Sequence, residues 1–317
     1  MRLIRNIKNF PHDILRDGSI LTIGAFDGLH IGHQVLLNAI KKISNKNKLP
    51  TIVMSFEPTP AEFFLQSKSP SRLMRFREKY EALDSLGIDI FFCPKFDKKM
   101  QNINVDDFIR ILLIQTLNIK HLIIGDDFHF ARNREGNFDH LQRSSKALGF
   151  ELTKISSVIE NDKRVSSTLI RQYLHSGNLE EAARYLGKPF RMSGKIIEGE
   201  KLGRKLGYPT ANVSISRIKT PIMGIFAVKI HGLSQEPLEG VASLGLRPTF
   251  YDKKKPLLEV HIFDFDRDIY GHYIQVDFLH KIRDEEKFIS SEAPVSYTHL
   301  RAHETKANLV CRLLLEK

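Results

Sequence analysis

The sequence predicts two domains of different class, an α/β domain with a doubly wound parallel sheet followed by a small antiparallel β-barrel. In the first half, continuous apolar runs alternate with amphipathic helical patterns, and in the second half short alternating runs are separated by Gly and Pro. The length of 317 residues is enough for two hydrophobic cores. We place the domains at residues 1–187 and 188–293, and treat residues 294–317 as a tail.

The first half is expected to alternate strands with helices. The expected strands are residues 20–26, 51–56, 88–93, 121–125 and 150–155. The expected helices are residues 33–43, 75–86, 105–117 and 136–148, with two shorter helices at 168–175 and 179–186. Buried strands joined by amphipathic helices indicate βαβ units, so the sheet should be parallel with helices on both faces.

The second half carries short extended patterns instead. The expected strands are residues 191–197, 224–230, 238–244, 257–263 and 274–279. Their length and their Gly and Pro punctuation are typical of a small closed barrel.

Composition narrows the class of protein. Cys93 and Cys311 are too few for a disulfide framework and wrongly spaced for zinc, which favours a reducing cytoplasm. No apolar run approaches the ~20 residues that cross a bilayer, and no apolar stretch follows the basic residues 1–10 as in a signal peptide. The net charge of +11 suits polyphosphate substrates. Nucleic-acid binding is the alternative, but no nucleic-acid module accompanies the charge.

The strongest motif lies between the first expected strand and its helix. Residues 22–33, Thr-Ile-Gly-Ala-Phe-Asp-Gly-Leu-His-Ile-Gly-His, leave a buried strand and enter a helix. The residues expected to line a nucleotide are Gly24, Phe26, Gly28 and Gly32. Glycines let backbone N–H groups approach an anion at the positive end of the helix, and ligands bind at the carboxyl ends of such strands.

His30 and His33 are spaced to face the same space at the start of that helix. Imidazoles there can donate hydrogen bonds to the charge that develops on a transferring phosphate. Two alternatives are a tight turn with surface histidines and a metal site, for which no third ligand is evident nearby.

The motif resembles the HxGH signature of the nucleotidyltransferase superfamily and, more narrowly, the adenylyltransferase half of bacterial FAD synthetases. Three further stretches are similar to that family: residues 55–60 (Ser-Phe-Glu-Pro-Thr-Pro), 125–130 (Gly-Asp-Asp-Phe-His-Phe) and 166–171 (Ser-Ser-Thr-Leu-Ile-Arg). Ala131 replaces the last glycine of the family's GxDFxFG loop. The resemblance implies transfer of the adenylyl group of ATP to FMN, with release of pyrophosphate and with Mg²⁺ on the phosphates.

The same resemblance assigns roles to individual residues. His30 and His33 would bind the reacting phosphates, and Arg171 the leaving phosphates. The residues implied near the nucleotide are Asp127, Ser166, Ser167 and Thr168, although a plain helix N-cap is the alternative for the hydroxyls.

Aromatic residues at the strand ends are candidates for the flavin. Phe56 and Phe128, with Phe130, could stack on isoalloxazine, although aromatics in such positions are more often core. Where some family members place Arg before the serines, this chain has Lys163 followed by Arg164, and either could supply the charge.

A second motif opens the second half. Residues 198–212 form a basic loop with Gly199, Gly203 and Gly207 that ends in Pro-Thr-Ala-Asn. An ordinary hairpin connection is the alternative, but the ending resembles the riboflavin kinase signature. Thr210 and Asn212 offer oxygen ligands two residues apart, which suits a Mg²⁺ that keeps water and nucleotide phosphate as its other ligands.

Glu259 is a carboxylate within an otherwise apolar strand. The family resemblance extends to about residue 290 and implies that Glu259 is the general base for the ribityl hydroxyl of riboflavin, with a strand-edge salt bridge as the alternative. Arg283 would contact flavin or phosphate by the same resemblance.

The tail from Pro294 to Lys317 resembles no part of the family and is similar to a translated adaptor sequence. The expected protein is therefore a bifunctional enzyme that uses ATP and handles riboflavin, FMN and FAD, with no nucleic-acid or membrane partner. The alternative is an FAD synthetase only, whose kinase half is impaired by the lack of a C-terminal helix.

Overall fold

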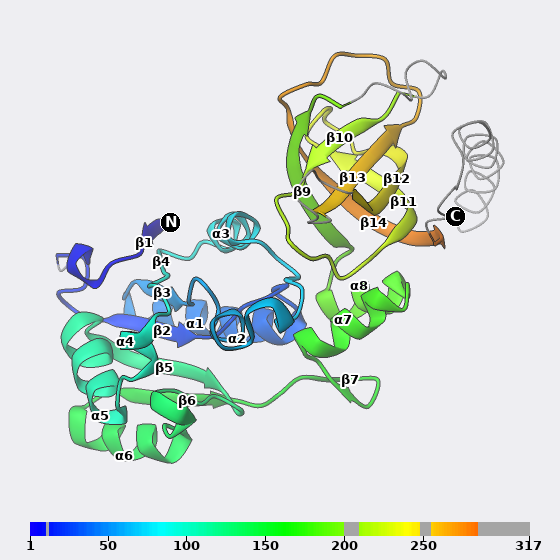
Figure 1. Cartoon of the computed structure of the whole chain (residues 1–317). Coiled ribbons are helices and arrows are strands. Elements are labelled where there is room, and N and C mark those ends of the chain that lie inside the picture. Colours follow the sequence, from blue (N-terminus) through cyan, green and yellow to red (C-terminus); the bar gives the residue numbers. More distant parts are fainter. Residues whose placement is uncertain (11–12, 200–208, 248–254, 285–317) are drawn as a thin grey trace. The chain divides into compact units, whose positions relative to one another are not determined.

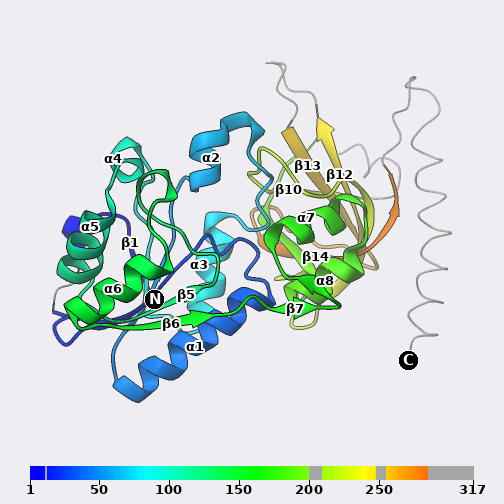
Figure 2. The same ribbon diagram turned by 90° about the horizontal axis from the view of Figure 1, so that it is seen from below.

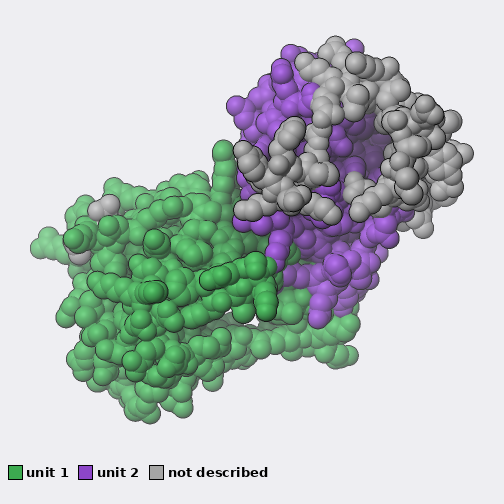
Figure 3. All heavy atoms as spheres, viewed as in Figure 1, with its two compact units in different colours: residues 1–170, 185–187 green, residues 171–184, 188–317 purple. Residues whose placement is uncertain are grey.

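The structure is a computed structural model that describes residues 1–10, 13–199, 209–247 and 255–284. The chain divides into two compact units, residues 1–170 with 185–187 and residues 171–184 with 188–317 (Figure 3). Gly203, Gly207 and the tail 294–317 lie outside the described residues. The boundary after residue 187 stays a prediction.

The first unit is built on a six-stranded sheet in the order β1-β4-β3-β2-β5-β6, in which every pair of neighbours is parallel (Figure 1). Its strands are β1 (Arg2–Ile4), β2 (Ser19–Ile23), β3 (Thr51–Met54), β4 (Ile90–Phe92), β5 (Ile119–Gly125) and β6 (Glu151–Ile155). The predicted parallel sheet is confirmed, with β1 as an additional edge strand.

Helices connect these strands. They are α1 (Ile31–Asn47), α2 (Pro60–Leu65), α3 (Phe76–Ser85), α4 (Lys98–Gln101), α5 (Val105–Asp107) and α6 (Phe138–Leu148). Two further helices, α7 (Ser167–His175) and α8 (Leu179–Leu186), follow the sheet and precede β9. The expected helix at 105–117 forms only one α-turn before it continues as a π-helix, η3 (Phe108–Thr116). A small hairpin, β7 (Ile159–Glu160) and β8 (Lys163–Arg164), precedes α7.

Helices cover both faces of the sheet (Figures 1 and 2). Alternate residues of each strand enter different cores, because successive side chains of a strand point to opposite faces. Ile52 and Met54 of β3 pack with residues of η3 and α6, whereas Val53 packs with residues of α1 and α3. The sheet is therefore doubly wound, as predicted.

The strand order reverses beside β2. The chain proceeds from β2 to β3 and β4 on one side and later to β5 and β6 on the other. In such sheets ligands bind outside the carboxyl ends of the strands at this reversal. β2 ends at Ile23, so Gly24 to Phe26, which were expected to continue the strand, instead begin the loop at that edge.

The second unit contains a closed barrel in the order β10-β13-β12-β11-β14-β9, with antiparallel neighbours throughout. Its strands are β9 (Phe190–Ile197), β10 (Ala211–Ser214), β11 (Gly224–His231), β12 (Leu238–Arg247), β13 (Lys255–Ile262) and β14 (Tyr273–Arg283). The predicted barrel is confirmed, but the Ala-Asn of Pro-Thr-Ala-Asn, expected to end a loop, begins β10. Side chains such as Phe226, Val260 and Phe278 fill the interior.

Across the described part of the chain, every helix is too short or too polar to span a bilayer.

Candidate functional site

The phosphate loop, residues 24–30, leaves β2 at the reversal point in a strained conformation. Phe26 and Leu29 have φ of 48° and 45°, and both side chains are buried. A side-chain-bearing residue in this region costs about 1–3 kcal/mol and persists only when its surroundings hold it. Gly28, at φ 86°, lies in a region that side-chain-bearing residues rarely adopt, and a Cβ there would lie 2.8 Å from Leu73 Cδ1. Strain of this kind is concentrated at ligand-binding loops.

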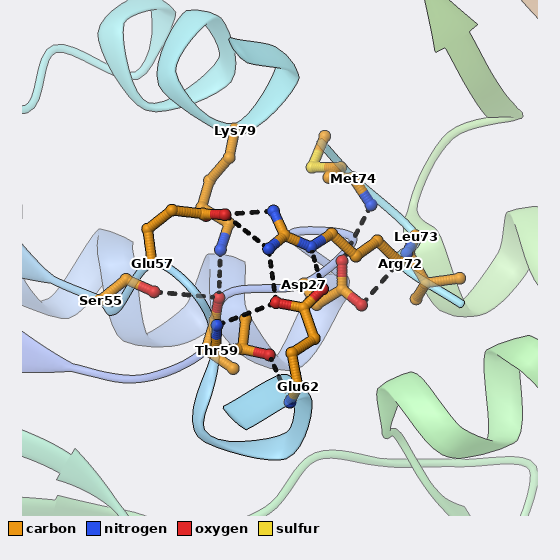
Figure 4. A network of polar contacts seen from close by, with 10 residues as sticks. Asp27, Ser55, Glu57, Thr59, Glu62, Arg72, Leu73, Met74 and Lys79 are labelled. Atoms are coloured by element: carbon orange, nitrogen blue, oxygen red, sulfur yellow. Dashed lines mark hydrogen bonds and ion pairs between the residues drawn. The ribbon is translucent and has the colours of Figure 1, made fainter. Parts of the chain in front are cut away.

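Asp27 ties the phosphate loop to the segment before α3. Its buried carboxylate accepts hydrogen bonds from the backbone N–H of Leu73 at 3.1 Å and of Met74 at 2.8 Å (Figure 4). Its own backbone oxygen accepts from Ser167 Oγ at 2.9 Å. Asp27 thus organises the loop, a role that its place in the motif did not reveal.

Ala25 is the second anchor of the loop. Its carbonyl oxygen accepts from Lys79 Nζ at 2.5 Å and from Ser55 Oγ at 3.3 Å. Lys79 lies on α3 and is only 4% exposed, so its ammonium group is almost enclosed. Two residues far apart in sequence therefore fix the carbonyl next to the strained Phe26.

His30 and His33 lie together at the start of α1. Their rings stack with centroids 3.6 Å apart, and His30 Nδ1 accepts from the backbone N–H of His33 at 3.3 Å as the N-cap of the helix. This bond leaves the proton of a neutral His30 on Nε2. His33 Nδ1 is buried and has no hydrogen-bond partner among the described residues.

The environment of His33 keeps its imidazole uncharged. Burial lowers its pKa well below the usual 6.5, and the charges of His30 and Lys79 lower it further. A neutral imidazole still offers one N–H donor. The stacked pair therefore presents hydrogen-bond donors at a helix N-terminus, an arrangement suited to phosphate oxygens.

The predicted hydroxyl cluster at the start of α7 has mixed roles. Ser167 is bound to the phosphate loop through Asp27, whereas Ser166 Oγ accepts from the backbone N–H of Leu169 at 3.2 Å, as an N-cap does. Thr168 is exposed. Arg171 lies one helical turn beyond Ser167 and groups with the second unit.

The loop after β5 carries the predicted Asp127. Arg164 donates to its carboxylate at 2.5 Å and lies 3.8 Å from Asp126, so the charge beside Asp127 comes from Arg164. The hydrogen bonds from Ser157 lower the pKa of Asp126.

The aromatic residues predicted to stack on the flavin differ in how deeply they are buried. Phe128 is partly buried and stacks on Phe130, with centroids 5.7 Å apart, while Phe130 itself is 6% exposed and belongs to the core. Phe56 is half-buried and contacts Phe96 edge-on at 5.4 Å.

In the barrel, the strand register aligns the predicted kinase residues on one face of neighbouring strands. Asn212 of β10 is the direct partner of Glu259 on β13, which in turn faces Ser243 on β12. Direct partners share a face of the sheet, and the intervening Leu258 and Val260 point into the core. The full row, here called the barrel row, runs Ile197, Asn212, Glu259, Ser243, Ile225 and Arg283.

Gly199 lies next to the side chain of Asn212. A Cβ at Gly199 would lie 1.9 Å from Asn212 Nδ2, so only glycine leaves room for the amide. Asn212 is 9% exposed, and Thr210 stands two residues before it, half-buried. Arg283 donates to the backbone oxygen of Asp284 at 3.3 Å.

Sequence reasoning missed several polar residues around the phosphate loop. Arg72, Lys79, Glu62 and Glu57 form a network beside it, and Ser243 faces Glu259 in the barrel. Lys79 lies in a charged helical pattern that is typical of a solvated face, so only its burial reveals it. Glu57 belongs to the Ser-Phe-Glu-Pro-Thr-Pro stretch, but its ion pair with Arg72 depends on the fold.

Comparison with known proteins matches both halves. The model of the FAD synthetase family matches residues 13–169, and that of the riboflavin kinase family matches residues 186–306. The chain is 42% identical over 307 residues to the bifunctional riboflavin kinase/FMN adenylyltransferase of Escherichia coli K12, covering 96% of this chain and 97% of that one. It is 43% identical over 290 residues to the protein of that name from Haemophilus influenzae, covering 92% and 93%.

A solved structure is similar over nearly the same length. The crystal structure of a Streptococcus pneumoniae protein described as a macrolide-efflux protein superimposes with a TM-score of 0.79 at 28% identity, covering 97% of this chain and 98% of that chain.

Proposed function

We propose that this chain, which belongs to the family of bifunctional riboflavin kinase/FMN adenylyltransferases, carries out the two reactions at two separate sites. The chain phosphorylates riboflavin to FMN and adenylylates FMN to FAD. We assign adenylyl transfer to the phosphate loop and riboflavin phosphorylation to the barrel row. The observation that carries the first assignment is the stacked His30–His33 pair at the start of α1, beside the reversal of strand order.

Adenylyl transfer joins an oxygen of the FMN phosphate to the α-phosphorus of ATP, while the bond from that phosphorus to the bridging oxygen of pyrophosphate breaks. Catalysis by positioning and charge stabilisation is sufficient for such a step. His30 and His33 donate hydrogen bonds to the phosphate oxygens, and Arg171 supplies positive charge for the leaving pyrophosphate. The glycine-containing stretch formed by Gly24, Phe26, Gly28 and Gly32 lets the backbone approach the nucleotide.

Further residues complete the proposed adenylyl-transfer site. We assign Ser166, Ser167 and Thr168 to the phosphates through their hydroxyl and N–H groups at the start of α7. Asp127, whose partner is Arg164, is assigned to the nucleotide. Phe56 and Phe128 are assigned to the isoalloxazine, because both are only partly buried whereas Phe130 belongs to the core.

Riboflavin phosphorylation joins the ribityl hydroxyl oxygen to the γ-phosphorus of ATP and releases ADP. We propose that Glu259 removes the hydroxyl proton, since this half-buried carboxylate lies on the outer face of the barrel beside Asn212. Arg283 lies in the same row and is assigned to flavin or phosphate. Gly199 is assigned to the nucleotide loop, together with Gly203 and Gly207, which lie outside the described residues.

The residues near Asn212 fit a divalent cation. Among the described residues no group of three or more His, Cys, Asp or Glu side chains is placed to hold a metal, so an all-protein cage is absent from that part of the chain. Mg²⁺ instead favours one or two protein oxygens with water and phosphate. Asn212 and Thr210 would supply those oxygens, since the bare backbone of Gly199 leaves space for the amide. When bound, Mg²⁺ neutralises charge on the transferred phosphate.

The matches over both halves favour the bifunctional enzyme over an FAD synthetase alone. We assign the net charge of +11 to the attraction of ATP and flavin phosphates, not to nucleic acid or membrane. The presence of only two cysteines supports a cytoplasmic location.

Incubation with riboflavin, ATP and Mg²⁺, followed by chromatographic separation of the flavins, tests this function. FMN should appear first and FAD later, and FAD should form directly when FMN replaces riboflavin. Failure to form FMN from riboflavin, or FAD from supplied FMN, would refute the corresponding half of the proposal.

A further inference from the structure

One short segment, residues 72–79, contacts both sides of the proposed adenylyl-transfer site. It runs from Arg72 through Leu73 and Met74 into the first turn of α3, which contains Lys79 (Figure 4). Leu73 and Met74 donate their backbone N–H groups to Asp27, as described above. The two cations at the ends of this segment reach different partners.

Lys79 faces the phosphate loop. Among the described residues its hydrogen bond goes to the carbonyl oxygen of Ala25, and the charges of Asp27 and Glu57 lie near enough to affect it. Burial lowers the pKa of Lys79, although these carboxylates oppose the shift. Enclosing an ammonium group is unfavourable unless its surroundings compensate it. The enclosed ammonium group therefore holds the Ala25 carbonyl oxygen in place.

Arg72 faces the flavin side of the proposed site, where Phe56 lies. It binds Glu57 through Nη1 at 3.0 Å and Nη2 at 2.6 Å, and Glu62 through Nε and Nη2 at 2.5 Å each. Glu57 directly follows Phe56, the proposed flavin aromatic, and Glu62 lies in the first turn of α2. Arg72 therefore links Glu57, the residue after Phe56, to α2.

Arg72 forms ion pairs with both Glu57 and Glu62. Burial would raise the pKa of Glu62, but hydrogen bonds from Arg72 and Thr59 outweigh it and lower the pKa to about 2. Burial would likewise lower the pKa of Arg72, but its bonds to Glu62 and Glu57 raise it. The charges persist at neutral pH, and bidentate pairs of this kind fix geometry as well as contributing energy.

We infer that residues 72–79 hold the phosphate loop and the flavin side of the adenylyl-transfer site in one geometry, with Lys79 and Arg72 as positioning residues. Lys79 acts through the Ala25 carbonyl on the strained loop that presents His30 and His33. Arg72 acts through Glu57 on Phe56. This inference rests on the proposed assignment of adenylyl transfer to the first unit, and it adds residues that the motifs did not include.

The two ends of the segment should have separable kinetic effects. Replacing Lys79 with Met removes the charge while keeping most of the side-chain volume. We expect kcat for FAD formation to fall by ~10²-fold and KM for ATP to rise, with KM for FMN unchanged, because a misplacement near 1 Å has an effect of this size. Arg72→Gln should instead raise KM for FMN about tenfold and leave KM for ATP unchanged. Arg72→Lys should recover only part of this loss, since Lys cannot form the bidentate pairs.

Arg77→Gln is the matched control, because Arg77 lies on the same helix and pairs with Glu81 on the exposed surface. It should leave all constants at wild-type values. Riboflavin phosphorylation in each variant reports the concentration of chain with a working barrel, and the FAD-forming rate is divided by it. Lys79→Arg serves if the Met variant does not fold; it keeps the charge but moves it, and should still lower kcat with KM for FMN unchanged.

The possible results separate this inference from the proposed function. If the wild-type chain forms no FAD from FMN, the assignment of the first unit fails. If it forms FAD and the Lys79 and Arg72 variants keep wild-type constants, only this inference is overturned. A uniform fall in kcat with both KM values unchanged in both variants would also overturn it, since neither end of the segment would then affect the binding of its substrate. A rise in KM for ATP alone in the Lys79 variant, with a rise in KM for FMN alone in the Arg72 variant, supports it.

Discussion

The phosphate loop and the barrel row present their reactive side chains by different means. The loop takes its shape from hydrogen bonds that arrive from distant segments: Ser55, Lys79, Ser167 and the backbone at Leu73 and Met74. In the barrel row, by contrast, strand register places Asn212 beside Glu259. A site built from loops is thus vulnerable to changes far away in sequence, whereas a site built from register is vulnerable mainly at its own positions.

The largest expected effect is on the barrel. Glu259→Gln removes the proposed general base, so riboflavin phosphorylation should fall by ~10²–10⁴-fold while FAD formation from FMN stays at its wild-type rate. Initial rates with each flavin measure both activities in one preparation. Phosphorylation at the wild-type rate would mean that Glu259 is structural and that the base lies elsewhere.

The reciprocal change in the loop should be nearly as large. His33→Ala removes one of the two stacked donors, and loss of a donor to developing charge typically lowers the rate by ~10²–10³-fold. FAD formation from FMN should fall accordingly, with riboflavin phosphorylation intact. An equal loss of both activities in a folded variant would argue against two separate sites.

A smaller change, in the Mg²⁺ requirement of the kinase, should distinguish a metal ligand from the general base within the barrel row. Asn212→Ala should raise the Mg²⁺ concentration required for half-maximal kinase activity by about tenfold, since one oxygen ligand is lost. Glu259→Gln should leave that concentration unchanged. Magnesium titrations of the two variants test this, and the same Mg²⁺ requirement in Asn212→Ala and wild type would exclude Asn212 as a ligand.

The smallest predicted change concerns protonation of the loop histidine. Because burial disfavours the charged imidazole, the pKa of His33 lies well below 6.5 and the ring should remain neutral as the pH falls through 6.5. The ring C–H resonance of His33, assigned by its absence in His33→Gln, should titrate with a midpoint below that value. A midpoint at or above 6.5 would show that the ring is charged in weakly acidic solution.

Much of the fold follows from periodicity. The strands around Ile52 and Ile123 are continuous apolar runs, and each is buried between two helical layers. The short strand β1 was missed because three residues carry too little pattern, and β10 was missed because Gly- and Pro-containing segments flank it. Local sequence does not report which edge of a sheet a short strand joins.

The candidate sites were predictable only in part, and for a physical reason. His30, His33 and Glu259 stand out because their residue types are unusual for their local pattern. Lys79 and Arg72 do not, since charged residues are common on helices and loops and their importance comes from partners far along the chain. Phe130 was expected as a candidate for flavin stacking, but the tertiary fold buries it in the core.

Mixing the two loss-of-function variants tests the central claim of two separate sites most directly. Neither His33→Ala nor Glu259→Gln alone should convert riboflavin to FAD, since each lacks one step. An equimolar mixture supplied with riboflavin, ATP and Mg²⁺ should form FAD, because FMN released by the first variant is adenylylated by the second. Absence of FAD from the mixture, when the second variant still converts added FMN and the first still releases FMN, would contradict the account.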